Sequence, residues 1–446
     1  MTTLGLIFVV AYALGFVFGR RVGLLAVAAA AVPFNDSSAI IFGDITISPF
    51  YLGMLAYLPL TYLRNGVPRP GSSLPVLLGV WATAITLVGP ALFAGMPVVA
   101  SGMGLDEQVS RLSELGYTSS NFAQVTYLLL NLALLVALAS SQDTKRWIPP
   151  IAAVVGTLVA TLAWSFEKAG MEWPDEIFHN NTRNAYAYVA SPRLAAQFSE
   201  PSHLGAFALT SAVMLTAIAL LQETRPVAKV VLLALVAADV VLIVESASAT
   251  ALGGAGIFAL IAILWGLYRM TIKGGRVSPT GILTVLVFAA FTILLMPRAV
   301  ALINDVVEYK LARGTSIRGR GSADASGWRV FLDSGALGVG LGSNRSSSLL
   351  ILLLSAGGLL GTLLFLLIMG RAIRDGLRER TRIPWAAGLV VLLLAEFFSY
   401  ADLVSPMMWL LAGFCWNASA VFEGRPKQVS RVQARSQTDT QLVAEP

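Results

Sequence analysis

The chain has 446 residues, of which 56% are hydrophobic and only 13% are charged, with a formal net charge of +6. A soluble globular domain carries about 25% charged residues, so this composition excludes one and indicates an integral membrane protein. The single cysteine, Cys415, lies in an apolar run, which excludes an intrachain disulfide and a cysteine-based metal centre.

Apolar segments taken in chain order predict about thirteen membrane-spanning helices, because a span needs about 20 largely apolar residues. The first segment has no basic leader and no obvious cleavage site, so we interpret it as a retained span and not a signal peptide. The predicted fold class is an all-α integral membrane protein with about 12–14 transmembrane helices. The segments are 4–18, 22–34, 46–62, 74–97, 122–140, 148–165, 204–221, 228–244, 251–268, 281–296, 347–369, 384–399 and 404–421.

The basic residues between these segments predict the orientation, because Lys and Arg of short loops stay on the cytoplasmic side. Most of the 31 Lys and Arg lie in alternate short loops and in the C-terminal tail, which we therefore place in the cytoplasm. The others lie in longer segments, which escape this rule and are predicted to face outward. The organisation expected is one polytopic transmembrane domain over 1–421, with two large periplasmic loops at about 166–203 and 297–346, and a disordered cytoplasmic tail over 422–446.

The first large outer loop ends in "FSEPSHLG", ahead of an apolar run. This pattern predicts a helix start with Ser199 as N-cap and Pro201 in the first turn. A carboxylate fixed there, Glu200, is placed to accept a proton, and His203 is the second candidate because histidine titrates nearest neutral pH. Arg193 would bind an anion or pair with Glu200. The alternative is a helix terminus with a structural histidine.

The second large outer loop is rich in arginine, and no acidic residue lies between Tyr309 and Ala323. The guanidinium fork matches phosphate oxygens in a bidentate way and keeps its charge at any physiological pH. This pattern predicts a site for a lipid phosphate or pyrophosphate headgroup, and the alternative is a solvated loop whose arginines pair with nearby acids. The candidate phosphate ligands are Arg318, Arg320, Arg329 and Arg345.

Alternating glycines follow in "GVGLGS", at Gly338, Gly340 and Gly342, just before a long apolar helix. Glycine permits close backbone approach, and amides ahead of a helix start can bind an anion. The alternative is a tight turn with close helix packing.

Two acidic residues, Asp239 and Glu396, lie inside apolar segments. Ionisable residues at membrane depth suggest a proton or ion path, so they support an alternative function as a polysaccharide or lipid transporter. A transporter would be expected to show related halves or broken helices, and no convincing internal repeat is present.

The stretch "FSEPSHLG", followed by "GWRVFLDSGALGVGLGSNRSSSLLILLLSAGGLLG", resembles the O-antigen polymerase and ligase superfamily of bacterial polysaccharide assembly. The resemblance implies a GT-C-like glycosyltransferase of the inner membrane with a periplasmic active site and no cofactor. Arg329 and Gly340 match the Arg-x10-Gly pattern of the polymerase branch, whereas Arg193 and Gly205 miss it by one residue. The histidine usual in the second loop of ligases is absent, which favours a polymerase over the alternative of a lipid A-core ligase.

The resemblance also implies a reaction: transfer of a growing glycan from undecaprenyl pyrophosphate to a sugar hydroxyl of another lipid-linked repeat unit. In this hypothesis Arg329 and Arg345, helped by Arg318 and Arg320, hold the pyrophosphate, while Glu200 or His203 deprotonates the acceptor. The partners expected are the lipid-linked glycan donor and acceptor, the lipid bilayer and a chain-length regulator, with no nucleic acid. No clustered His, Cys or DxD-type site occurs in the outer loops, so we predict catalysis without metal.

Overall fold

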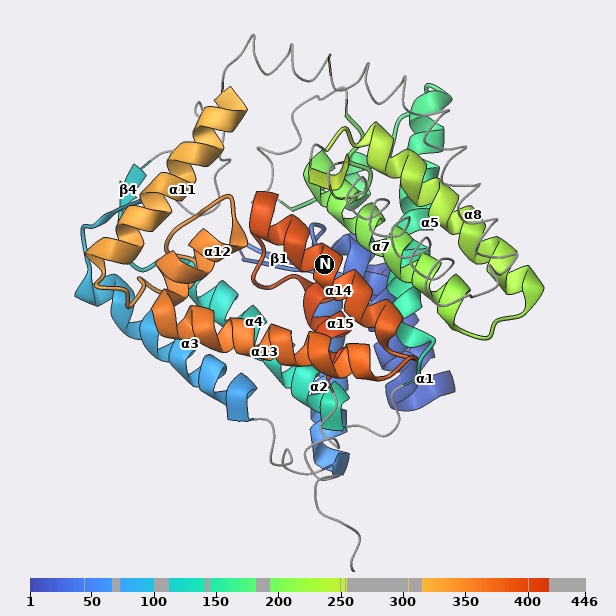
Figure 1. Ribbon diagram of the computed structural model, residues 1–446, viewed down its shortest axis with the longest axis horizontal. Coiled ribbons are helices and arrows are strands. Elements are labelled where there is room, and N and C mark those ends of the chain that lie inside the picture. The colour runs from blue at the N-terminus through green and yellow to red at the C-terminus, as the bar shows by residue number, and fades with distance from the viewer. Residues whose placement is uncertain are drawn as a thin grey trace, which may run out of the picture.

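The computed structural model describes residues 1–43, 45–65, 73–99, 112–140, 145–181, 193–248, 250–252, 254, 304, 315–399 and 401–416. Segment 281–296, most of segment 251–268 and the tail 422–446 lie outside these ranges. The described part is mostly helical, and seven of its helices are long and apolar enough to cross a membrane (Figure 1). This confirms the mostly helical character and fits an all-α membrane protein.

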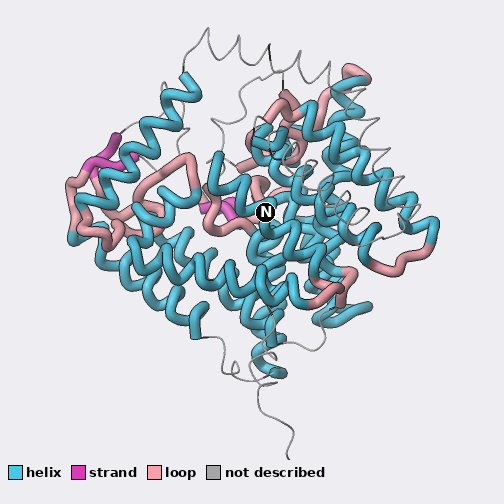
Figure 2. Tube along the Cα trace, in the orientation of Figure 1, coloured by secondary structure: helices cyan, strands magenta, loops and turns pink. Residues whose placement is uncertain are grey.

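The apolar helices of ten or more residues coincide closely with the predicted segments. They are α1 (Thr3–Ala31), α2 (Pro49–Asn65), α3 (Ser73–Leu92), α4 (Ser119–Ser140), α5 (Ile148–Lys168), α7 (Pro201–Leu221), α8 (Pro226–Glu245), α13 (Gly358–Arg378), α14 (Ile383–Ser399) and α15 (Pro406–Cys415). Shorter elements join them: η1 (Val32–Phe34), α6 (Asp175–Phe178), α12 (Leu349–Leu352) and η3 (Leu353–Gly357). Figure 2 shows two short antiparallel strand pairs beside the helices, β1 (Ile40–Phe42) with β2 (Ile45–Ile47) and β3 (Pro97–Val99) with β4 (Leu112–Glu114).

The first two predicted segments form the two halves of α1. The backbone is non-helical at Arg20 (φ 49°, ψ −128°), where the chain folds back on itself. Gly15 and Gly23 lie at the contact between the halves, and a Cβ added to Gly23 would lie 1.9 Å from the carbonyl oxygen of Gly15. Glycine is therefore required here for close packing of the two halves.

Helix α7 lies at the centre of the packing and is buried on nearly all sides, as expected for a helix that is apolar all round. It packs against α5, α8 and α14, while α14 and α15 connect this group to α4 and α13. The largest fully buried side chains include Trp385, Trp409 and Phe365. This arrangement places α7 in the core of the described part of the chain.

The predicted outer loop 297–346 contains a further helix, α11 (Thr315–Asp333). The glycines of this segment disfavour a helix in isolation, so the sequence did not predict α11. Ala323 and Val330 are buried on one face, and a Cβ added to Gly327 on that face would lie 2.6 Å from Ser346 Oγ and Ile351 Cγ2. Packing against β3 and η3 therefore stabilises α11, where local propensity does not.

Candidate functional site

The segment that leads into α7 is held against the end of α8. Arg193 Nε donates to the carbonyl of Ser246 at 3.0 Å, and the Leu194 amide donates to the carbonyl of Glu245 at 3.1 Å. The Glu245 carboxylate pairs with Lys168 at 3.2 Å, at the end of α5. The end of α8 therefore fixes the position of Arg193, and the Lys168–Glu245 ion pair ties that end to α5.

The N-cap of α7 is Glu200, with Pro201 at the first helical position. The predicted N-cap, Ser199, was wrong by one residue. The reason is tertiary: the Ser199 amide and hydroxyl both donate to Asp36 Oδ2, at 3.0 and 2.9 Å. Its hydrogen-bonding groups are thus directed to η1 and the turn after it, away from the α7 backbone.

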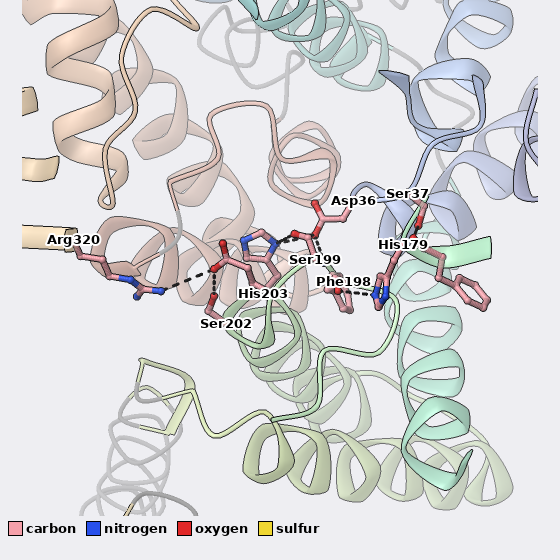
Figure 3. A network of polar contacts seen from close by, with 10 residues as sticks. Asp36, Ser37, His179, Phe198, Ser199, Ser202, His203 and Arg320 are labelled. Atoms are coloured by element: carbon pink, nitrogen blue, oxygen red, sulfur yellow. Dashed lines mark hydrogen bonds and ion pairs between the residues drawn. The ribbon is translucent and has the colours of Figure 1, made fainter. Parts of the chain in front are cut away.

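Asp36 also contacts His203, whose Nδ1 lies 2.8 Å from the same Oδ2 atom (Figure 3). Burial raises the pKa of Asp36, but the facing His203 ring and the Ser199 donors more than offset this and hold the pKa below its ordinary value. Asp36 was not among the candidates from the sequence. Its only local signal is the polar run "NDSS" between two apolar segments, which gives no indication of a partner so distant in the chain.

The two charged segments singled out in the sequence meet at Glu200. Arg320 on α11 places Nη2 4.0 Å from Glu200 Oε2, and Ser202 Oγ donates to the same oxygen at 3.1 Å (Figure 3). Burial raises the pKa of Glu200, but the charges of His203, Arg345 and Arg320 together lower it below the ordinary value. Glu200 is therefore ionised at neutral pH, among positive groups from both segments.

Arg193 belongs to the same electrostatic cluster. Burial lowers its pKa first, the nearby Arg320 charge lowers it further, and Glu200 acts in the opposite direction. Guanidinium groups that repel one another are stabilised when an anion lies between them. The structure thus brings together five of the residues predicted from sequence, which can hold a polyanion beside a proton acceptor: Arg193, Glu200, His203, Arg320 and Arg345.

The glycine-rich loop positions Arg345. Gly338, Gly340 and Gly342 all have positive φ, of 82°, 96° and 74°. A Cβ on Gly340 would lie 2.9 Å from Thr86 Cα, and one on Gly342 would lie 2.6 Å from the Ser120 carbonyl oxygen. The loop therefore needs glycine for both backbone conformation and close contact with α3 and α4.

The amides of this loop bond to the protein itself. The Gly338 amide donates to Ser334 Oγ at 3.1 Å, and the Gly340 amide donates to the Ala356 carbonyl at 2.9 Å. Asn344 Oδ1 accepts from the Val99 amide at 3.0 Å. These bonds favour the packing interpretation of the glycines over the anion-binding one, at least for Gly338 and Gly340.

Asp324 ties α11 to the start of α12. Its carboxylate accepts from the Ser347 amide and hydroxyl, both at 2.7 Å, and from the Ser348 amide at 3.2 Å. Asp324 lies one turn after Arg320, so the same face of α11 carries the anchor and the site arginine.

Replacing Asp324 with alanine is expected to lower the free energy of unfolding by about 2–4 kcal/mol, because several charge-assisted hydrogen bonds are lost together. Thermal unfolding of the purified protein in detergent measures this. Asp333→Ala, which removes an exposed carboxylate from the same helix, should change stability by less than about 0.5 kcal/mol. Equal effects of the two substitutions would contradict the anchoring role of Asp324.

The structure does not bring Arg329 into this cluster. At about 100° per residue, the nine positions from Arg320 to Arg329 amount to two and a half turns of α11, so the two side chains leave opposite faces. Arg329 is exposed. Arg318 is in the first turn of α11, and its side chain lies outside the described residues.

The two intramembrane acids are fully buried. Thr157 Oγ1 donates to Asp239 Oδ1 at 2.7 Å, which links α5 to α8. Glu396, on α14, is buried close to Ser405. The negative charge of Asp402 interacts electrostatically with both Glu396 and His203.

Across the described ranges, no group of three or more His, Cys, Asp or Glu residues is arranged to hold a metal ion. Compared with known proteins, the chain matches no protein-family model and no curated relative. The residues that meet around Glu200 are therefore the features of this chain that bear on its function.

Proposed function

We propose that this protein is a glycosyltransferase of the bacterial inner membrane that polymerises undecaprenyl-pyrophosphate-linked oligosaccharide repeat units at the periplasmic face. The observation that carries the proposal is the meeting of Glu200 and His203 with Arg320 and Arg345. A proton acceptor beside fixed cations is what glycosyl transfer from a pyrophosphate requires. These residues also come from segments that the basic-residue distribution assigns to the outer side.

The reaction makes two opposite electrostatic demands on the site. The acceptor hydroxyl oxygen attacks the anomeric carbon of the donor glycan, and the bond from that carbon to the pyrophosphate oxygen breaks. The bonding electron pair leaves with the pyrophosphate, whose charge must be held, while the hydroxyl proton passes to a base. Cations and a proton acceptor in one place satisfy both demands.

In this proposal Arg320, Arg345 and Arg193 bind the pyrophosphate. Each guanidinium offers several donors in a plane, which suits phosphate oxygens better than a single ammonium does. Glu200 keeps the arginines in place through its charge, and either Glu200 or His203 accepts the proton. Because Arg329 lies on the opposite face of α11, its role rests on the sequence pattern alone.

The wider parts of the proposal are a GT-C-like arrangement, a cytoplasmic C-terminus and a chain-length regulator as partner. Leucines exposed on α13, including Leu359, Leu363 and Leu367, supply an apolar surface that suits contact with the bilayer. The donor and acceptor lipids would reach the site from that bilayer.

The banding pattern of lipopolysaccharide or exopolysaccharide from a deletion strain tests this function. Complementation with wild type should restore the long-chain ladder, whereas Glu200→Gln should leave a single repeat unit on its acceptor. Glu176→Gln is the matched control, because Glu176 is an exposed carboxylate on α6 in the same outer segment. Polymer that accumulates on the carrier lipid would show a ligase instead, and repeat units retained on the cytoplasmic side would show a transporter.

A further inference from the structure

We infer that His203 is the proton acceptor of this site and that Asp36 is a positioning residue that fixes its ring. The inference rests on the proposed function and selects between the two bases which that function leaves open. It also gives a role to the turn after η1, a segment far from both outer loops in the sequence.

The contact between Asp36 and His203 determines which ring nitrogen carries a proton. Asp36 Oδ2 lies 2.8 Å from Nδ1 of His203. An ionised carboxylate can only accept a hydrogen bond, so Nδ1 must donate one. In the neutral ring the lone pair is then on Nε2, which is the atom that can take a proton from the acceptor hydroxyl.

Ser199 completes the arrangement without acting as a nucleophile. Its hydroxyl donates to Asp36 Oδ2 at 2.9 Å and lies 3.2 Å from Nδ1 of His203. In a Ser-His-Asp triad the serine and the aspartate contact opposite nitrogens of the ring. Here both face Nδ1, so the geometry does not suit a covalent seryl intermediate. The Ser199 hydroxyl instead helps to hold the Asp36 carboxylate in place through its hydrogen bond.

Glu200 is less suited to accept the proton. Its carboxylate pairs with Arg320 and is affected by the charge of Arg345, and both lower its affinity for a proton. An imidazole has an ordinary pKa closer to neutral than that of a carboxyl group, and only its neutral form can accept the proton. Once protonated, the His203 ring faces Asp36 and experiences the negative charges of Glu200 and Asp402, which stabilise the charge that develops.

Asp36 is held by contacts that do not involve His203. Ser37 Oγ donates to the Phe178 carbonyl at 2.6 Å, and the Ser38 amide donates to Asn180 Oδ1 at 2.7 Å. These bonds fix the turn after η1 against the segment around α6. The position of the Asp36 carboxylate is therefore set by contacts that are independent of the His203 ring, as a positioning residue requires.

The full step balances within the site. The acceptor hydroxyl proton passes to Nε2 of His203 as the new carbon–oxygen bond forms, and the pyrophosphate leaves with the electron pair of the broken bond. The imidazolium then returns its proton to water or to the departing phosphate. No oxidant, reductant or further reactant is needed.

The proton position on His203 can be measured directly, because the chain has only 2 histidines. Spectra of full-length protein with 15N-labelled histidine, in lipid nanodiscs, distinguish the two neutral tautomers, and His179→Gln assigns the signals. The wild type should show the His203 proton on Nδ1, and Asp36→Ala should shift it to Nε2, the tautomer that free histidine prefers. A wild-type ring protonated on Nε2 alone, or one doubly protonated at the pH of turnover, would overturn the inference.

Turnover of lipid-linked repeat units by the purified protein supplies the second test. Asp36→Asn should lower kcat by about 10²–10⁴-fold with little change in KM, because only the proton transfer is impaired. Asp36→Glu, which keeps the charge, should recover part of the loss. Asp175→Asn is the matched control, since Asp175 faces His179 at the same 2.8 Å outside the site, and it should stay within about twofold of wild type.

The double variant Asp36→Asn, His203→Gln should be no slower than His203→Gln alone, because residues that act as one unit are not additive. An active wild type with unchanged kcat in Asp36→Asn would overturn the positioning role alone. A wild-type protein that converts no lipid-linked repeat unit would overturn the proposed function itself.

Discussion

Arg320→Ala is expected to lower glycan polymerisation by about 10²–10³-fold, whereas Arg329→Ala should stay within about threefold of wild type. Both substitutions remove one guanidinium from α11. Only Arg320 lies on the face that reaches Glu200, at 4.0 Å, while Arg329 is on the opposite, exposed face. The pair therefore separates the effect of site geometry from the effect of lost charge.

The measurement is turnover of lipid-linked repeat units, with membrane insertion checked for each variant. Arg320→Lys should recover little activity, since an ammonium does not reproduce the guanidinium fork. The resemblance to the polymerase branch predicts the reverse order, because Arg329 and not Arg320 meets the Arg-x10-Gly spacing. A loss in Arg329→Ala with an active Arg320→Ala would reject our assignment of the pyrophosphate ligands.

Gly342→Ala is expected to lower the free energy of unfolding by about 3–5 kcal/mol. The added Cβ would lie 2.6 Å from the carbonyl oxygen of Ser120, a backbone atom of α4, and the residue has a φ of 74°. Backbone strain from the positive φ and steric overlap of the added Cβ with Ser120 therefore both destabilise the folded state. Relief of the overlap would move the loop that positions Arg345, so activity should fall with stability.

Gly335→Ala is the matched control for this prediction. Gly335 also has positive φ, of 61°, but nothing lies within 4 Å of an added Cβ. It should cost only the conformational strain of about 1–2 kcal/mol. Thermal unfolding in detergent compares the two variants. A stable but inactive Gly342→Ala protein would instead support the anion-binding interpretation of the glycine-rich loop.

The sequence predicted the long helices well, because a helix surrounded by lipid needs an unbroken run of apolar residues, and that requirement is local. It missed α11, whose glycines and polar residues contradict its helical state. Burial of Ala323 and Val330 against the rest of the protein stabilises the helix. These tertiary contacts cannot be predicted from the sequence of the segment itself.

The candidate site also has some features that the sequence predicts and others that only the structure shows. Composition and spacing alone indicated a membrane protein and selected Glu200, His203 and arginines in two charged segments, because residue types and their order are properties of the chain. Only the tertiary structure placed Arg320 and not Arg329 beside Glu200, and only it brought Asp36 to His203. These contacts join residues far apart in the chain, and their geometry depends on how helices pack and rotate against one another, which no local pattern encodes.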